Sequence, residues 1–92
     1  MAIQCTGIQI VGGTQHEHIA HFRWTMDGTN NAGICTRTQM VAFVEHGEVA
    51  YVRDAFGNVA FLGVRLSAYG DKYVQTHAEG VWTDVLLSLP RF

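Results

Sequence analysis

The 92-residue chain is poor in charged residues, and the two signs nearly balance. Lysine and arginine number 6, and aspartate and glutamate number 8, which gives a formal net charge of −2 at pH 7. A duplex-DNA binder or a polybasic membrane-surface protein needs a broad positive field. The composition therefore excludes a basic tail and a polybasic membrane patch, and it makes duplex nucleic acid an unexpected partner.

Long hydrophobic runs are also missing. The longest ones cover residues 41–44 and 59–64, whereas a membrane-spanning helix needs about 18 or more apolar residues. Residues 1–5 contain no basic segment followed by an apolar one, so we expect no signal peptide. We accordingly predict a cytoplasmic protein with no membrane partner.

Only two cysteines occur, Cys5 and Cys35. Small secreted domains that rely on disulfides usually contain more, and zinc sites usually show cysteines in Cys-x-x-Cys pairs. We therefore predict two buried free thiols, and neither a metal nor a cofactor.

Apolar residues are plentiful, at 48% of the chain, which predicts one compact domain over residues 1–92. A phase change at Gly7 indicates a bulge in the first strand, and Thr36 with Gln39 forms a helix capping box. The expected elements are strands over 3–11 and 19–26, a helix of about ten residues after Thr36, strands over 48–54, 59–66 and 72–76, and a helical turn over 82–89. The predicted fold class is α+β, an antiparallel sheet of about five strands with one helix on one face and a short C-terminal helical turn, in the order ββαβββ.

Alternation within the strands separates an apolar face from a polar one. Phe22 and Trp24 fall on the apolar face of their strand, which is typical of core residues. Three arginines and one tyrosine fall on strand positions that face the other way, with Phe61 nearby: Arg23, Arg53, Arg65 and Tyr51. A basic and aromatic sheet face suits an anionic small ligand or a protein partner, so we predict these four as ligand-binding residues.

A cluster of histidines near the start of the second strand offers an alternative. On a regular strand, His16 and His18 point to the same face and His21 to the other. With a carboxylate from a turn, the pair forms the basis of a metal-assisted hydrolase.

No catalytic pair or phosphate-binding loop is evident, so we predict no catalytic residues and favour a function other than catalysis. The preferred hypothesis is a small binding or protein-interaction module that forms homo-oligomers, because small sheets expose edges that self-association covers. A third hypothesis is binding of single-stranded nucleic acid through the strand aromatics.

The C-terminal part of the chain carries a recognisable pattern: Lys72-Tyr73-Val74-Gln75-Thr76-His77-Ala78-Glu79-Gly80, followed by Asp84-Val85-Leu86-Leu87-Ser88-Leu89-Pro90. The pattern resembles the end of the small bacterial proteins grouped as domain of unknown function 3892, with a Tyr-x-x-Thr segment, a tight turn and a Leu-Leu-x-Leu-Pro tail. The pair His18-Ile19 and the stretch Gly47-x-x-x-Tyr51-Val52 are also similar to that family. The resemblance implies a compact bacterial or phage-borne domain and brings no assigned activity with it. We expect Asp84 to cap the final helical turn and Leu86 to lie across the sheet.

Overall fold

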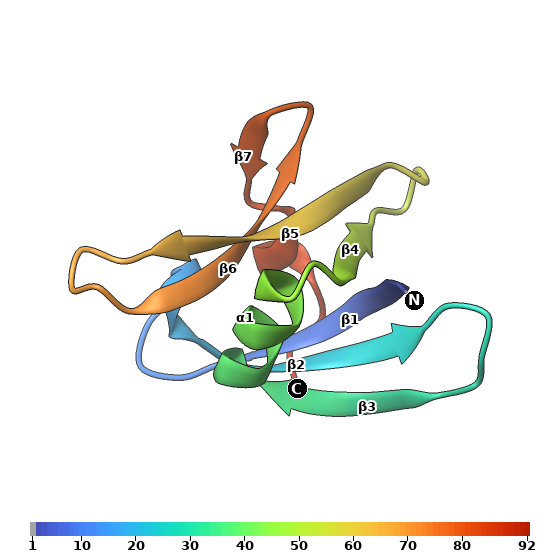
Figure 1. Ribbon diagram of the computed structural model, residues 1–92, viewed down its shortest axis with the longest axis horizontal. Helices are drawn as coiled ribbons and strands as arrows, with labels where there is room; N and C mark the ends of the chain where they lie inside the picture. Colours follow the sequence, from blue (N-terminus) through green and yellow to red (C-terminus); the bar gives the residue numbers. More distant parts are fainter. Residues whose placement is uncertain (1) are drawn as a thin grey trace.

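The computed structural model describes residues 2–92 and has the predicted α+β class (Figure 1). Met1, the first residue of the segment in which we expect no signal peptide, lies outside this range. The strands are β1 (Ala2–Ile10), β2 (Ile19–Met26), β3 (Ala32–Thr36), β4 (Val49–Arg53), β5 (Val59–Leu66), β6 (Lys72–Ala78) and β7 (Val81–Thr83). The helical segments are α1 (Arg37–Glu45) and the 3-10 turns η1 (His16–His18) and η2 (Val85–Ser88). No helix within residues 2–92 has the length and apolar character needed to cross a bilayer.

The strands form one sheet in the order β3-β2-β1-β4-β5-β6-β7. The prediction of about five antiparallel strands is therefore incomplete: β3 and β7 are additional, and β1 pairs with β4 in parallel. The two missed strands are short and border loops with strong turn signals, so no alternating pattern is long enough to identify them. In Figure 1 the sheet bends, and α1 lies between β5–β6 and β1–β2.

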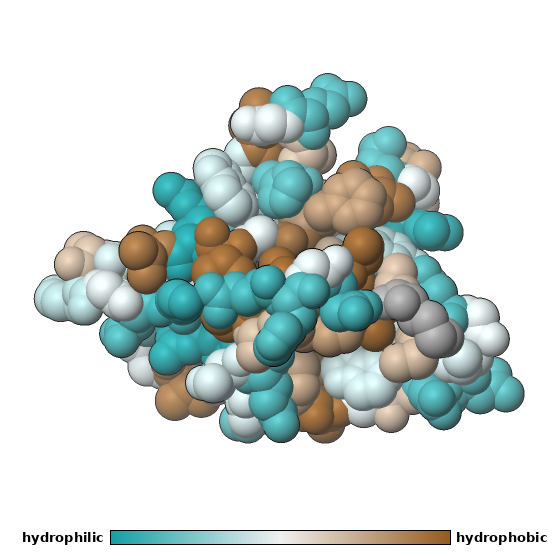
Figure 2. Space-filling model, viewed as in Figure 1, coloured by the Kyte–Doolittle hydropathy of each residue, from teal (hydrophilic) through white to brown (hydrophobic). Residues whose placement is uncertain are grey.

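The concave side of the bent sheet holds the hydrophobic core. Phe22 is fully buried, and Trp24 and Met26 pack against the core, as the alternation in β2 predicts. Figure 2 shows hydrophobic residues gathered in the middle of this view, between β5 above and β2 below. The buried cluster consists of Ile3, Cys5, Ile8, Ile19, Phe22, Met40, Val41, Ala50, Val52, Leu62, Val74 and Leu86.

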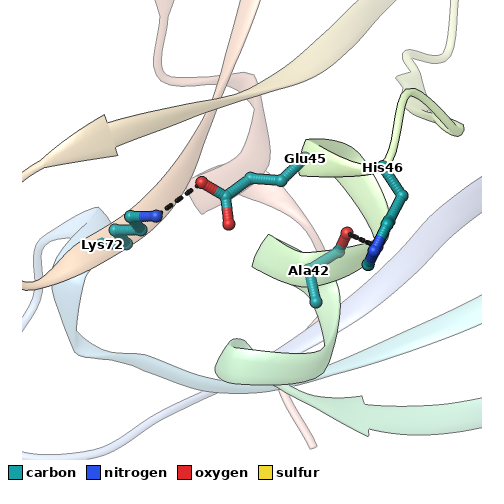
Figure 3. A network of polar contacts seen from close by, with 4 residues as sticks. All are labelled: Ala42, Glu45, His46 and Lys72. Carbon is teal, nitrogen blue, oxygen red and sulfur yellow. Dashed lines mark hydrogen bonds and ion pairs between the residues drawn. The ribbon is translucent and has the colours of Figure 1, made fainter.

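Helix α1 begins and ends as its local sequence predicts. Thr36 Oγ1 accepts a hydrogen bond from Gln39 N–H at 3.1 Å, and Gln39 Oε1 accepts one from Thr36 N–H at 2.9 Å. At the other end, His46 Nδ1 donates to the Ala42 carbonyl at 2.8 Å (Figure 3). The same carbonyl accepts the His46 backbone N–H at 3.0 Å, so the imidazole adds a second hydrogen bond at the helix end.

One ion pair connects α1 to the sheet. Lys72 Nζ on β6 lies 2.6 Å from Glu45 Oε2 in the last turn of α1 (Figure 3). Both side chains are exposed, so screening limits the contribution of the pair to about 1 kcal/mol or less. Apolar packing, not this pair, accounts for most of the attachment of α1.

The C-terminal tail completes the sheet next to β1. The predicted bulge is present, since the register between β1 and β2 shifts between Cys5 and Gly7. Ile8 N–H donates to the Pro90 carbonyl at 3.0 Å, and Phe92 N–H donates to the Ile8 carbonyl at 3.1 Å. The tail therefore occupies the side of β1 that β4, paired only with residues 2–4, leaves open. The predicted cap at η2 is wrong, because the Asp84 side chain makes no capping hydrogen bond.

Strands β6 and β7 form a hairpin with a two-residue turn. Both turn residues have positive φ, 53° at Glu79 and 79° at Gly80. Glycine adopts this left-handed conformation freely, whereas a residue with a Cβ does so at a cost of roughly 1–2 kcal/mol. Glu79 is therefore the less suitable residue in this turn, which favours Asn-Gly or Asp-Gly.

Replacing Glu79 with asparagine is expected to stabilise the protein by up to about 1 kcal/mol, because asparagine tolerates the left-handed conformation. Urea denaturation measures the gain. Glu79→Gln is the matched control, since it removes the same charge without the conformational preference. An equal gain in both variants would attribute the effect to charge and contradict the conformational explanation.

Candidate ligand-binding face

A row of aromatic side chains crosses four neighbouring strands on the convex face of the sheet. Tyr51 on β4 is in register with Phe61 on β5, Phe61 with His77 on β6, and His77 with Trp82 on β7. Cross-strand partners in register project from the same face of a sheet. We call these four residues the aromatic row.

Three rings of the aromatic row, those of Phe61, His77 and Trp82, lie against one another. The Phe61 and His77 ring centroids lie 6.5 Å apart with a 42° tilt, and those of His77 and Trp82 lie 5.4 Å apart in a T-shaped arrangement. Phe61 is 46% exposed and Trp82 is 41% exposed. Phe61 and Trp82 thus each expose part of their surface to solvent, and the imidazole of His77 lies between them.

Tyr51 is the buried end of the row. Its hydroxyl donates to both carboxylate oxygens of Asp27, at 2.7 Å and 2.9 Å. This hydrogen bond, with burial, raises the pKa of Tyr51 above its usual value. Tyr51 therefore supports the row from within the sheet, and Phe61 and Trp82 provide its accessible surface.

A glycine on β5 allows the indole to lie against the sheet. A Cβ atom at Gly63 would be 2.9 Å from Trp82 Cη2 and 3.1 Å from His77 Cδ2. Such distances are shorter than ordinary van der Waals contacts, so any larger residue would displace the rings. Gly63 thus forms the floor of the row.

Buried polar contacts hold β7, and with it Trp82, in place. Thr76 is fully buried, and its hydroxyl shares a 2.7 Å hydrogen bond with the Thr83 hydroxyl. Gln75 Nε2 donates to the Thr83 carbonyl at 3.0 Å. Because β7 has only three residues, these contacts add to the few backbone hydrogen bonds that such a short strand can form.

Two of the predicted arginines flank the row. Arg65 Nη1 donates to Gln75 Oε1 at 2.9 Å, and the Arg65 guanidinium lies 4.8 Å from the centroid of the Trp82 ring. At the other end, the exposed Arg53 lies 5.8 Å from the centroid of the Tyr51 ring. Arg65 in particular is held in one orientation by a hydrogen bond and by a cation–π contact.

Arg23 lies apart from the other predicted site residues. It is on β2, which the sheet order separates from β4 by β1. Its guanidinium lies 4.5 Å from the centroid of the Phe92 ring. The structure thus places Arg53 beside Tyr51 at one end of the row, Arg65 beside Trp82 at the other end, and Arg23 against Phe92.

A hollow opens beside the aromatic row. Its volume is about 590 Å³, and Phe61, His77 and Glu79 contribute to its lining. Hollows of this size lie in the range of small-molecule sites. This side of the sheet therefore has a hollow, two partly exposed aromatic rings and two arginine side chains, one at each end of the row.

The histidines predicted as an alternative site do not share a strand face. Residues His16–His18 form the 3-10 turn η1, so the prediction that His16 and His18 lie on a regular strand is wrong. His18 Nδ1 accepts a hydrogen bond from Gln15 N–H at 3.2 Å, while His16 is buried. Residues 2–92 contain no group of three or more His, Cys, Asp or Glu side chains placed to hold a metal ion.

Burial of His16 makes stability depend on pH. The side chain is 6% exposed and its Nε2 has no hydrogen-bond partner. Burial lowers the pKa of His16, and the nearby Arg65 lowers it further, against opposing effects of Asp84 and Glu17. The folded state therefore binds this proton less readily than the unfolded chain, whose histidine pKa is about 6.5.

The free energy of unfolding is consequently expected to fall as the pH drops below about 6.5, the pKa of the unfolded histidine. The contribution of His16 is complete above the unfolded pKa and is lost as the pH falls from there toward the lower folded value. Urea denaturation at several pH values measures the slope, and His16→Gln should flatten it. A slope that stays the same in His16→Gln would show that other groups produce the dependence.

Both cysteines are free thiols with raised pKa values. Burial, together with the nearby Cys35, raises the pKa of Cys5 to about 12, and burial raises that of Cys35 to about 11. The prediction of buried thiols is confirmed for Cys5, whereas Cys35 is only half-buried. Neither is ionised at neutral pH, so neither is an activated nucleophile.

Comparison with known proteins gives a family and no function. Searches of curated proteins and of solved structures find no match. A family model described as "Protein of unknown function (DUF3892)" matches residues 3–90, nearly the whole chain. The protein therefore belongs to the DUF3892 family, as the C-terminal pattern indicates.

Proposed function

We propose that the protein is a non-enzymatic binding module whose ligand lies on the convex face of β4–β7. The observation that carries this proposal is the aromatic row with an arginine at each end, Arg53 and Arg65. Guanidinium groups bind phosphate and carboxylate through paired hydrogen bonds, and exposed rings offer stacking surfaces. The ligand class is accordingly an anion that carries a flat ring.

Preorganisation of this face supports the proposal. The hydrogen bond to Gln75 and the contact with Trp82 restrict the Arg65 side chain before any ligand arrives. A side chain that is already ordered loses less conformational entropy on binding. Only one of the five N–H donors of a guanidinium is used in the bond to Gln75, so others are available to an anion.

Native mass spectrometry of untagged protein, purified without chelator, tests this function. We expect a species heavier than the polypeptide, and we expect Arg65→Ala to lose the added mass. Lys72→Ala, which removes one positive charge next to α1, is the matched control and should keep it. The same added mass in Arg65→Ala as in the native protein would show that the ligand lies elsewhere.

We also propose self-association through the edge of the sheet. Strand β3 is one edge, and Ile34 in its centre is 57% exposed. Exposed apolar edge strands pair readily with other strands, and a lysine there prevents pairing. Light scattering should therefore give a multiple of the 10.2 kDa chain mass, and Ile34→Lys should give the monomer. A monomeric native protein would contradict this part of the proposal.

The free thiols support a reducing, cytoplasmic compartment as part of the same proposal. The strand placement on which the metal-assisted hydrolase alternative was based is absent, because His16 and His18 lie in the 3-10 turn η1.

A further inference from the structure

The binding face is longer than a single small anion needs. Arg53 is paired with Val59, and Arg65 lies six positions further along β5. At about 3.3 Å per residue, the two arginine positions are about 20 Å apart. The two guanidinium groups contact rings that lie three strands apart, Tyr51 on β4 and Trp82 on β7, so a chain of phosphates is better suited than one phosphate to reach both.

The rings between the arginines suit bases that are not paired. Phe61 and Trp82 are partly exposed on neighbouring parts of the face, and the hollow lined by Phe61 and His77 lies beside them. Aromatic side chains stack on the flat faces of bases, and those faces are hidden inside a duplex. The low net charge of −2 also argues against a duplex, which proteins bind through many cations.

We propose that the ligand of this face is a single-stranded nucleic acid, with bases stacked on Phe61 and Trp82 and phosphates bound by Arg53 and Arg65. The inference rests on the proposed function and names its ligand class. Phosphates recur every 3.4 Å or more along a single strand, so a few nucleotides span the distance between the arginines. RNA and DNA share this chemistry.

Two acidic groups near the face, Asp54 and Asp27, are engaged in hydrogen bonds, whereas Glu79 opposes a polyanion. The Asp54 carboxylate accepts hydrogen bonds from Phe56 N–H and from the Asn58 backbone and side chain, so it is directed into its own turn. The Asp27 carboxylate accepts from Tyr51. Glu79 is exposed at the hollow and opposes a phosphate there. Replacement with glutamine should therefore strengthen binding.

Fluorescence anisotropy at low salt tests the inference with labelled oligothymidylate and oligouridylate of about ten nucleotides. We expect both single strands to bind, and we expect a duplex of equal length to bind at least about ten-fold more weakly. Trp82→Ala should weaken single-strand binding by about 5- to 100-fold through loss of one stacked base, while Trp82→Phe should retain most of the affinity.

The salt dependence separates a phosphate contact from a structural role. Each of Arg53→Ala and Arg65→Ala should reduce the slope of log K against log salt concentration by about 0.7. Lys72→Ala, on the α1 side, should leave the slope unchanged.

The inference would be overturned by no binding of either oligonucleotide, by duplex binding equal to single-strand binding, or by single-strand affinity unaffected by Trp82→Ala. Adenosine monophosphate that binds as tightly as the oligonucleotide would also overturn it, because one nucleotide would then suffice. That last result leaves the proposed function intact. Failure of the proposed function would give a different result: in native mass spectrometry, the Arg65→Ala variant would keep the same added mass as the native protein.

Discussion

Truncation of Leu86 to alanine is expected to lower the free energy of unfolding by about 2–5 kcal/mol. Leu86 lies in η2, near the end of the chain, yet it is fully buried and belongs to the central hydrophobic cluster. Removing its methyl groups leaves a cavity that the surrounding strands can only partly fill. The C-terminal tail is thus part of the core.

Leu66→Ala is the matched control for this substitution. Leu66 ends β5 and is 64% exposed, so the same chemical change should cost less than about 1 kcal/mol. Urea denaturation compares the two variants. Equal midpoints for Leu86→Ala and the native protein would mean that the tail does not pack in the core.

Truncation of Phe22 to alanine should have the largest effect, a loss of about 3–5 kcal/mol. Phe22 is 0% exposed and lies in β2, in register with Ile8 on β1 and Cys35 on β3. The ring therefore bridges three strands on the concave side of the sheet, and its loss leaves the cavity at their junction.

The control for Phe22 is Phe56→Ala. Phe56 is 90% exposed in the turn between β4 and β5, and its truncation should change stability by no more than about 0.5 kcal/mol. Thermal or urea unfolding followed by circular dichroism measures both variants. A loss in Phe56→Ala as large as that in Phe22→Ala would contradict the assignment of the core.

Features that depend on neighbouring residues were predictable from the sequence. The capping box between Thr36 and Gln39 is such a feature, because cap and partner are three positions apart. The bulge at Gly7 and the apolar face of β2 follow from the alternation of side chains along one strand. In each case the physical cause lies within a few residues of chain.

Features that depend on strand order were not predictable. The parallel pairing of β1 with β4 places Gln4 beside Tyr51, and no local pattern specifies which strands become neighbours. For the same reason, alternation places Arg53 and Arg65 on polar strand faces but does not show that Trp82 on β7 lies against Arg65. The prediction of a helical turn at Trp82 is wrong: Trp82 lies in a short strand that pairs with β6, where the Thr83 and Thr76 hydroxyls also share a hydrogen bond.

The residues that carry the family resemblance have mainly structural roles. Thr76 bonds to Thr83, Leu86 is in the core, and the Pro90 carbonyl accepts a hydrogen bond from Ile8. The tail pattern therefore describes how the sheet is completed. The proposed ligand surface lies mostly on other residues, among them Arg53, which precedes that pattern.

Amide chemical-shift mapping tests the central claim, that the convex face of β4–β7 binds the ligand, most directly. In a titration of ¹⁵N-labelled protein with oligothymidylate, we expect the shifts to centre on Phe61, His77 and Trp82, including the indole N–H of Trp82, and to reach Arg53 and Arg65. Shifts confined to α1 and β3, or a spectrum that does not change, would contradict the account.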